Sequence, residues 1–452
     1  MKLRIIIICF FIVSTFVYAQ NNEESRRATI QYGTETEIAS LIQTLRNEKE
    51  EYLDDELVIL IENTRNQRIL TSVFGFFGER EKGGLEERAL RAIQEREDET
   101  NETILAAVDY LGRVKPAEAI PVLMELLNTG ERRFMNSAFR ALGRASSSDS
   151  EAAGEIADFL IDFYNNQNPG TENQSEVITA IGATRSSNGV SFLAEIVTDN
   201  SARTPLRIAA LGALSSIGDN DGLEAIIGCI SAGDPNVRSA AVSALGPFSG
   251  EDVDKAILEA FRDSYYRTRI AAAQASGARK FEAAVPYLRY RAERDETANV
   301  KDEAVRALGA IANEEANTVL ESLFAERRNP DRVRILAAEM LFKNEPDKHF
   351  TKLIIELDDA KTKNQTALYN GLLKVIGETK LAGDKTEIVN ITSRFLLNGG
   401  IIEKLYGLDM AANNGLVMLS PQIKTMTGDR NETIARRARR TAETLGIELS
   451  DE

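Results

Sequence analysis

Residues 233–261 read GDPNVRSAAVSALGPFSGEDVDKAILEAF, two helix-like stretches separated by a Gly-Pro break. In each stretch the apolar residues recur at the spacing of a helix rather than of a strand, so each has one apolar stripe. A segment this short cannot bury both stripes by itself. The stretch therefore predicts a structural unit that depends on neighbouring units for its core.

The same pattern recurs along the chain at a nearly constant interval. Aligned on Leu245, the landmark residues are Phe77, Leu111, Leu142, Ile181, Leu214, Leu245, Ser276, Leu308, Leu341, Ile376, Met410 and Leu445. Successive landmarks are 31 to 39 residues apart. The residue four positions earlier is usually small, as in Ala107, Ala241 and Ala304, which lets two helices approach closely. A period of this length is typical of stacked helix-turn-helix repeats.

A second apolar segment of helical spacing lies between successive landmarks, as in residues 119–127, 189–197, 222–230 and 316–324. Pro121 and Pro286 fall near the starts of such segments, where a missing backbone donor is harmless. Glycine often follows the landmark, and we expect it to cap the helix there, at Gly112, Gly143, Gly246, Gly309 and Gly446. The chain is thus predicted to be all-α, an α-solenoid of about 11–12 stacked helix-turn-helix repeats.

The phrase GDPNVR at residues 233–238, followed by Ala241 and Leu245, resembles the HEAT repeat, especially its short bacterial form that also occurs in phycobilin lyases. Residues 119–127 resemble the first helix of that repeat. The resemblance covers residues 36–450 and is weaker over 36–104 and 346–450. It implies the fold but little about function, because this architecture serves scaffolds, receptors and a few enzymes.

The chain begins MKLRIIIICFFIVSTFVYAQ, in which two basic residues precede an apolar run that ends before Ala19. This order is typical of a secretory signal peptide cleaved after Ala19. The apolar run is short for a membrane span, although an uncleaved anchor is the alternative. We expect a signal peptide over residues 1–19, a linker over 20–35 and a solenoid over 36–450. The mature protein is expected to be exported to the periplasm or cell envelope without an integral membrane span.

The charge of the chain restricts its partners. The net charge is −16, from 70 acidic and 54 basic side chains. An acidic surface of this size opposes nonspecific binding to nucleic acid, so no nucleic-acid partner is expected. Cys9 lies in the signal segment, which leaves Cys229 as the single cysteine of the mature chain. We expect Cys229 to be a buried small hydrophobe.

The residue types that most catalytic sites require are scarce. His349 is the only histidine, so neither a Ser-His-Asp or Cys-His arrangement nor a histidine-based metal site can readily be assembled. The sequence also lacks a phosphate-binding loop and a Gly-X-Gly-X-X-Gly motif. We therefore predict no catalytic residues, no metal and no cofactor. A hydrolase or lyase that uses two converging carboxylates is the alternative.

A basic residue lies seven positions before the landmark in five successive repeats, at Arg207, Arg238, Arg269, Lys301 and Arg334. Stacking brings these residues into a row along the solenoid. In one interpretation, which the HEAT resemblance supports, each pairs with an aspartate of its own or a neighbouring repeat. The candidate partners are Asp199, Asp234, Asp263 and Asp331. In the other interpretation the row is an exposed cationic stripe for an anionic ligand. We call the row of paired residues in the first interpretation a ladder of ion pairs. This ladder is favoured because unpaired like charges stacked in register would repel one another.

The last predicted helix contains four arginines, Arg436, Arg437, Arg439 and Arg440. They form either the exposed face of a terminal repeat or a contact with anionic lipid or an acidic partner. For the whole chain the sequence favours a non-catalytic scaffold that binds a protein or peptide on its concave face. We expect the second helices of the repeats to line that face. A receptor for a small anionic ligand and a carboxylate-based hydrolase or lyase are the alternatives.

Overall fold

The computed structural model describes residues 23–145, 150–166, 170 and 173–449. The expected signal peptide and its cleavage point at Ala19 lie outside these residues. Every regular element of the described chain is a helix, which confirms the all-α prediction. The chain divides into two units, Met1–Cys229 and Ile230–Glu452.

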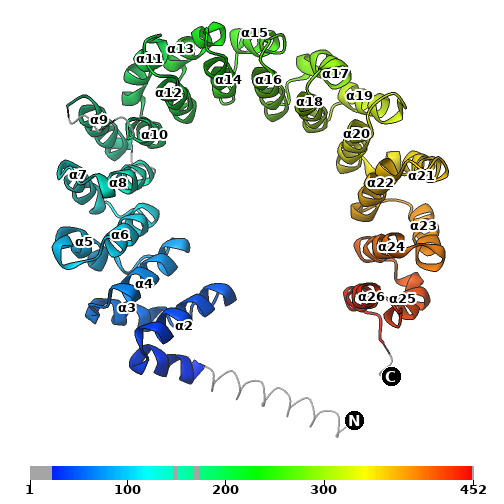
Figure 1. Ribbon diagram of the computed structural model, residues 1–452, viewed down its shortest axis with the longest axis horizontal. Helices are drawn as coiled ribbons and strands as arrows, with labels where there is room; N and C mark the ends of the chain where they lie inside the picture. Colours follow the sequence, from blue (N-terminus) through cyan, green and yellow to red (C-terminus); the bar gives the residue numbers. More distant parts are fainter. Residues whose placement is uncertain (1–22, 146–149, 167–169, 171–172, 450–452) are drawn as a thin grey trace. The chain divides into compact units, whose positions relative to one another are not determined.

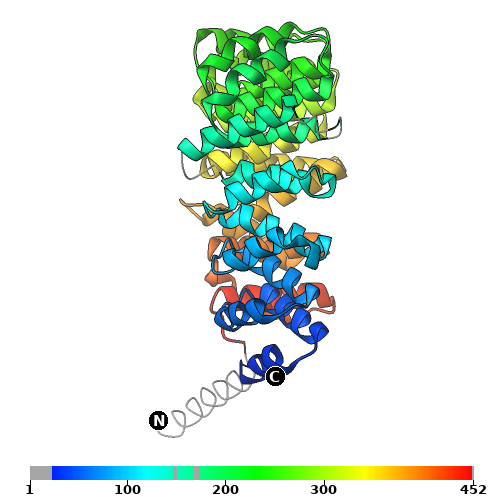
Figure 2. The same ribbon diagram turned by 90° about the vertical axis from the view of Figure 1, so that its left-hand side faces the viewer.

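In each unit the helices form two layers, one of even-numbered and one of odd-numbered helices (Figure 1). The even-numbered layer of the first unit consists of α2 (Glu35–Glu48), α4 (Gln67–Glu79), α6 (Asn101–Val114), α8 (Arg132–Ala145), α10 (Gln174–Thr184) and α12 (Thr204–Ile217). Its odd-numbered layer consists of α3 (Asp54–Asn63), α5 (Glu86–Gln94), α7 (Ala119–Asn128), α9 (Ser150–Asn166), α11 (Val190–Thr198) and α13 (Leu223–Gly228). Figure 2 shows from the side how helices of this unit lie across the direction of stacking.

The second unit has the same organisation. Its even-numbered layer consists of α14 (Pro235–Ala244), α16 (Tyr266–Ala278), α18 (Ala298–Ile311), α20 (Asp331–Asn344), α22 (Thr366–Glu378), α24 (Ile401–Asn414) and α26 (Glu432–Thr444). Its odd-numbered layer consists of α15 (Glu251–Ala260), α17 (Val285–Arg294), α19 (Glu314–Ala325), α21 (Pro346–Thr362), α23 (Thr386–Asn398) and α25 (Ser420–Thr427). Each even-numbered helix packs on the next one of its unit.

The landmark column of the sequence coincides with the even-numbered layer. Every landmark from Phe77 to Leu445 lies in, or directly ends, an even-numbered helix from α4 to α26. The small residues four positions earlier, such as Ala107, Ala241 and Ala304, are fully buried. The repeat prediction is therefore confirmed, with each repeat supplying one helix to each layer.

The prediction that the glycines after the landmarks cap their helices is wrong for three of them. Gly112, Gly143 and Gly309 lie inside α6, α8 and α18, so they are not helix caps. A Cβ atom on Gly112 would lie 2.7 Å from the Cα of Ala141 in α8. Glycine is needed there because neighbouring even-numbered helices approach too closely for a side chain. Gly446, with a φ of 64°, does follow the end of α26 as expected.

The expected linker over residues 20–35 also differs from the structure. Residues 23–32 are helical, and Ile30 is buried. Arg26 forms an ion pair of 2.8 Å with Glu48 at the end of α2. Residues 20–35 lack the repeat pattern, so the sequence did not predict a helix there. The helix is nevertheless held against the solenoid by the buried Ile30 and by the ion pair of Arg26.

Candidate functional site

The basic column predicted from the sequence is held by groups of the protein itself. Arg238 donates two hydrogen bonds to the carboxylate of Asp263, at 2.7 and 3.0 Å. Its remaining terminal nitrogen donates to the carbonyls of Ala232 and Gly233. The carboxylate belongs to the turn that precedes the next even-numbered helix, so this ion pair joins consecutive repeats.

Arg269 repeats this geometry one repeat later. It donates to both oxygens of Asp295, at 2.8 and 2.9 Å, and to the carbonyls of Asp263 and Ser264. Asp263 thus binds one arginine through its carboxylate and the next through its carbonyl. Burial raises the pKa of Asp263, but hydrogen bonds from Arg238 and the backbone outweigh it, so this pKa lies below its usual value.

Arg207 and Arg334 share a second geometry. Arg334 donates to the carbonyl of Phe324, ten residues earlier, and to Glu356, 22 residues later. Arg207 donates to the carbonyl of Val197, also ten residues earlier, and to the Cys229 sulfur at 3.7 Å, also 22 residues later. Cys229 is buried, and it occupies the position that Glu356 has in the other repeat. Cys229 is therefore both a buried apolar side chain and the hydrogen-bond partner of Arg207 in the basic column.

The other expected ladder residues have different partners. Lys301 donates to the carbonyl of Glu293 at 3.5 Å. Asp199 accepts hydrogen bonds from Ser201, and Asp234 accepts one from the backbone of Asn236. The carboxylates that meet Arg238, Arg269 and Arg334 come from the following repeat, and one of them, Asp263, is among the candidates named from the sequence. Because these guanidinium groups bind the protein's own carboxylates, the column offers little space to an external anion.

Other titratable groups are also committed to internal contacts. Burial raises the pKa of Asp409, which pairs with Arg437 of the C-terminal arginine cluster at 2.7 Å. Arg439 donates to the carbonyl of Thr427. His349 is 4% exposed, and burial lowers its pKa. Across the described residues, no group of three or more His, Cys, Asp or Glu side chains could hold a metal ion.

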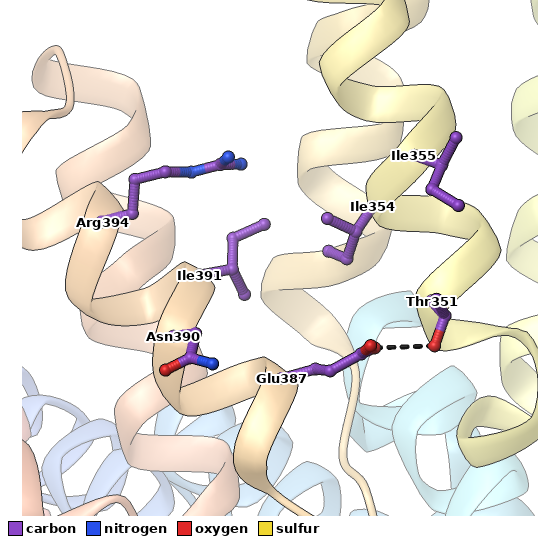
Figure 3. A pocket seen from close by; sticks show the side chains of 7 residues that line it. All are labelled: Thr351, Ile354, Ile355, Glu387, Asn390, Ile391 and Arg394. Atoms are coloured by element: carbon purple, nitrogen blue, oxygen red, sulfur yellow. Dashed lines mark hydrogen bonds between the residues drawn. The ribbon is translucent and has the colours of Figure 1, made fainter.

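An apolar pocket of 320 Å³ lies between α21 and α23 (Figure 3). Each helix presents residues at positions i, i+3, i+4 and i+7 to the pocket or its end. These residues are Thr351, Ile354, Ile355 and Asp358 on α21, and Glu387, Asn390, Ile391 and Arg394 on α23. Such spacing puts four side chains on one helical face. The pocket is therefore built from two matched faces of neighbouring odd-numbered helices.

Polar contacts between the two helices close both ends of this pocket. At one end the Thr351 hydroxyl donates to Glu387 at 2.7 Å. At the other end Arg394 donates to both oxygens of Asp358, at 2.7 and 3.0 Å. Ile354 and Ile391 lie between these contacts on opposite walls (Figure 3). The cavity is open to one side and bounded along its length.

The two helices that form this pocket are each preceded by a connection of different length. Only Glu345 lies between α20 and α21, whereas residues 379–385 connect α22 to α23. The longer connection is fixed, because Asp347 at the start of α21 accepts the backbone N–H groups of Ala382 and Gly383. Both walls of the pocket are therefore helices, and the connection that leads into α23 is held against the start of α21.

A charged network lies behind the Arg394 end of the pocket. Glu403 accepts hydrogen bonds from Lys361, Tyr369 and the backbone of Gly400. Burial raises the pKa of Glu403, but these donors outweigh it and leave the pKa below its usual value. The hydrogen bond to Asp358 raises the pKa of Arg394.

Large exposed apolar side chains lie on helices of both layers, and Ile401 and Ile402 belong to the even-numbered helix α24. Ile355 is 62% exposed, Leu397 on α23 is 60% exposed, and Ile59 and Tyr290 also lie on odd-numbered helices. Binding on a concave face lined by the even-numbered helices stays a prediction. The pocket was missed at the sequence level, although the extra apolar residues beside the core positions of α21 were visible there.

Comparisons with known proteins identify one family. The model of the family described as "Spirochaete HEAT repeat protein" matches residues 30–441. No curated protein is similar to the chain in sequence. Within the described residues, no helix has the length and apolar character needed to cross a membrane.

Several solved structures are similar to the chain. Human deoxyhypusine hydroxylase in complex with glycerol is 18% identical over 57% of this chain and 99% of that chain, with a TM-score of 0.26. Karyopherin Kap121p bound to the extreme C-terminus of the protein phosphatase Cdc14p is 10% identical over 93% and 53%, with a TM-score of 0.45. Importin beta is 12% identical over 93% and 72%, with a TM-score of 0.43. The chain spans about half the length of the Kap121p chain.

Proposed function

The chain belongs to the spirochaete HEAT repeat protein family, and from this premise we propose that it is a non-catalytic scaffold for a protein partner. The partner binds at the pocket between α21 and α23. The scaffold acts in the periplasm or cell envelope, because residues 1–19 have the order of a signal peptide. Repeat arrays of this kind bury their own stripes and leave long surfaces for recognition.

The pocket between α21 and α23 is the observation that carries this proposal. Its two polar ends are seven residues apart on each helix, about 10 Å along the axis. The polar contacts bound the pocket along its length but leave one side open, so a partner enters it with a side chain rather than with a continuous helix or strand. One aliphatic or aromatic side chain fits, and a buried anchor of that kind supplies much of the energy of an interface.

The experiment is crosslinking in cells with a photoreactive residue in place of Asn390 on the tagged full chain. Mass spectrometry identifies what is captured. We expect one protein to recur, and its capture to fall at least tenfold in an Ile355→Glu variant, since a buried charge without a partner opposes binding. Ile59→Glu is the matched control, because Ile59 is 65% exposed on α3.

Two outcomes would contradict the scaffold proposal. One is equal capture by the Ile355→Glu and Ile59→Glu variants, which would remove the pocket from the interface. The other is turnover of a substrate by the purified protein together with its loss in a point variant. Sequencing the N-terminus of the protein recovered from the periplasmic fraction tests the location separately, and Gln20 is the residue expected there.

A further inference from the structure

A second pocket, of 510 Å³, is lined by the C-terminal ends of α3 and α5 and by the turn between α3 and α4. All ten residues that line it are polar or charged, whereas three isoleucines line the α21–α23 pocket. The two pockets belong to different units of the chain and share no residue. The proposed scaffold function uses no contact of this polar pocket.

A buried arginine, Arg88, lines the polar pocket at a position that is apolar in other repeats. Arg88 lies 23 residues before the landmark Leu111. In four other repeats the residue at this distance before the landmark is a fully buried apolar side chain, namely Ala119, Val253, Val285 and Leu353. A buried charge costs stability unless it is well paired. Because the repeat fold accommodates an apolar residue at this position, packing alone does not explain Arg88.

The ion pair between Arg88 and Glu99 leaves bonding capacity unused on both sides. Among the described residues the Arg88 guanidinium donates one hydrogen bond, to Oε1 of Glu99 at 2.7 Å. The two side chains are only 7% and 9% exposed. The other carboxylate oxygen of Glu99, Oε2, is buried and accepts no hydrogen bond from any described group. Buried polar groups are normally satisfied, so this pair indicates a missing donor and a missing acceptor.

Charged groups of both signs also remain unpaired in the lining. Arg65, in the turn between α3 and α4, and Glu95 and Asp98, after α5, are exposed and form no ion pair within the described part of the chain. Arg91 and Glu62 form a pair of 2.7 Å. The lining as a whole contains four carboxylates and three guanidinium groups, so its charge is nearly balanced. The complementary ligand therefore carries both a positive and a negative group.

We propose that this pocket binds a free amino acid or a short peptide as a zwitterion. The ammonium group of the ligand binds the carboxylates of Glu99 and Asp98, and its carboxylate binds the guanidinium groups of Arg88 and Arg65. Hydrogen bonds between ionised groups are stronger than neutral ones, and these complete the bonding that Arg88 and Glu99 lack within the protein. The site does not depend on the α21–α23 pocket, so either one can be disproved without the other.

The test uses the full mature chain with each standard L-amino acid and with glycylglycine as probes. Differential scanning fluorimetry measures the melting temperature, which a ligand of the folded state raises in a saturable way. We expect at least one probe to do so, and calorimetric titration gives its affinity. N-acetylation and C-terminal amidation of that probe should each weaken binding at least tenfold, because each removes one charge and leaves protein groups unpaired. Tighter binding of glycylglycine than of any amino acid would identify a peptide as the ligand.

Three variants locate the site. Glu99→Gln and Arg65→Gln should each weaken binding of the best probe about tenfold. Glu97→Gln is the matched control and should leave the affinity unchanged, because Glu97 is exposed beside Asp98 but does not line the pocket. Arg65 is exposed, so Arg65→Gln keeps the test valid if Glu99→Gln does not fold.

Other outcomes overturn the proposal. A melting temperature that no probe changes would show that Arg88 and Glu99 form a hydrated pair without a ligand. Undiminished binding of the acetylated probe would make the pocket an anion site, and undiminished binding of the amidated probe would make it a cation site. Binding of glucose but of no amino acid would make it a site for hydroxyl groups. An equal loss of affinity in Glu97→Gln and Arg65→Gln would indicate a diffuse effect of charge.

Discussion

Asp295 holds two arginines at once, Arg269 and Arg291, so a change at this single residue should have an unusually large effect. In Asp295→Asn the buried Arg269 loses the carboxylate that it binds through two hydrogen bonds, and the exposed Glu296 lies farther away, at 3.9 Å. We expect the free energy of unfolding to fall by about 3–5 kcal/mol, the usual cost of breaking a buried pair. Urea denaturation followed by circular dichroism measures it. Asp252→Asn, whose side chain is 83% exposed, is the control and should change it by less than about 0.5 kcal/mol.

The same residue gives a pH dependence with a defined sign. Burial raises the pKa of Asp295, but its bonds to Arg269 and the backbone outweigh this and lower it. A carboxylate with a lowered pKa in the folded state stabilises fully above its unfolded value, about 3.9. That contribution is lost as the pH falls through the folded pKa. Wild type should therefore lose more stability than Asp295→Asn below pH ~4, and parallel curves for the two proteins would disprove this.

His349 should also cost the protein stability as the pH falls, but in a higher pH range than Asp295. Burial lowers its pKa, and Lys348 adds to this, although Glu321 and Glu345 favour the protonated form. The unfolded chain binds the proton first, so stability should fall as the pH drops below about 6.5. His349→Gln should show a smaller decrease in its urea midpoint between pH ~7.5 and ~5.5. An equal decrease in both proteins would show that other groups carry the effect.

At the scale of helices, two glycines that lie one and two residues from a landmark have opposite roles. A Cβ on Gly182 in α10 would lie 2.5 Å from the Cα of Ala213 in α12, while a Cβ on Gly212 in α12 would meet nothing within 4 Å. Gly182→Ala should destabilise by about 1–3 kcal/mol through overpacking. Gly212→Ala should stabilise by about 0.5–1 kcal/mol through helix propensity. Thermal unfolding of both variants measures the contrast, and equal shifts would contradict it.

The helices could be predicted from the sequence because the same pattern of apolar and small residues recurs in each repeat. The landmark column, the small residues before it and the apolar segments between landmarks all predict helices that the structure contains. The two pockets could not be predicted in this way. The α21–α23 pocket depends on the spacing of two helices, which the connections at Glu345 and residues 379–385 influence. Periodicity within a helix does not report that spacing.

The sequence also could not predict which carboxylate each arginine of the basic column binds. Arg238 and Arg269 reach carboxylates 25 and 26 residues later, but Arg334 reaches one 22 residues later. In the first two cases the carboxylate is in the turn after the odd-numbered helix, and in the third it is inside that helix. Residue type and spacing indicated that the arginines belong to a row. Which acid each arginine meets depends on the length and placement of the next helix.

At the scale of the molecule, damage to one repeat should stay local. Each repeat contacts chiefly its neighbours, so stability is close to a sum of repeat and interface contributions. In Gly182→Ala we expect faster amide hydrogen exchange in α8, α10 and α12, and unchanged exchange in α20 to α26. Mass spectrometry of the exchanged protein resolves these segments. A uniform increase along the chain would mean that the array unfolds as a single cooperative body.

The ion pairs between repeats also bear on how such a chain can change in length over generations. Arg238 and Arg269 have equivalent surroundings, each with two carbonyls behind it and one aspartate ahead. A gene that lost residues 239–269 would place Arg238 where Arg269 stood, facing Asp295. A gene that lost half of that segment would leave a buried guanidinium with no counterion. Whole repeats can therefore be gained or lost by recombination without new compensating mutations at the join, whereas fractions of a repeat cannot.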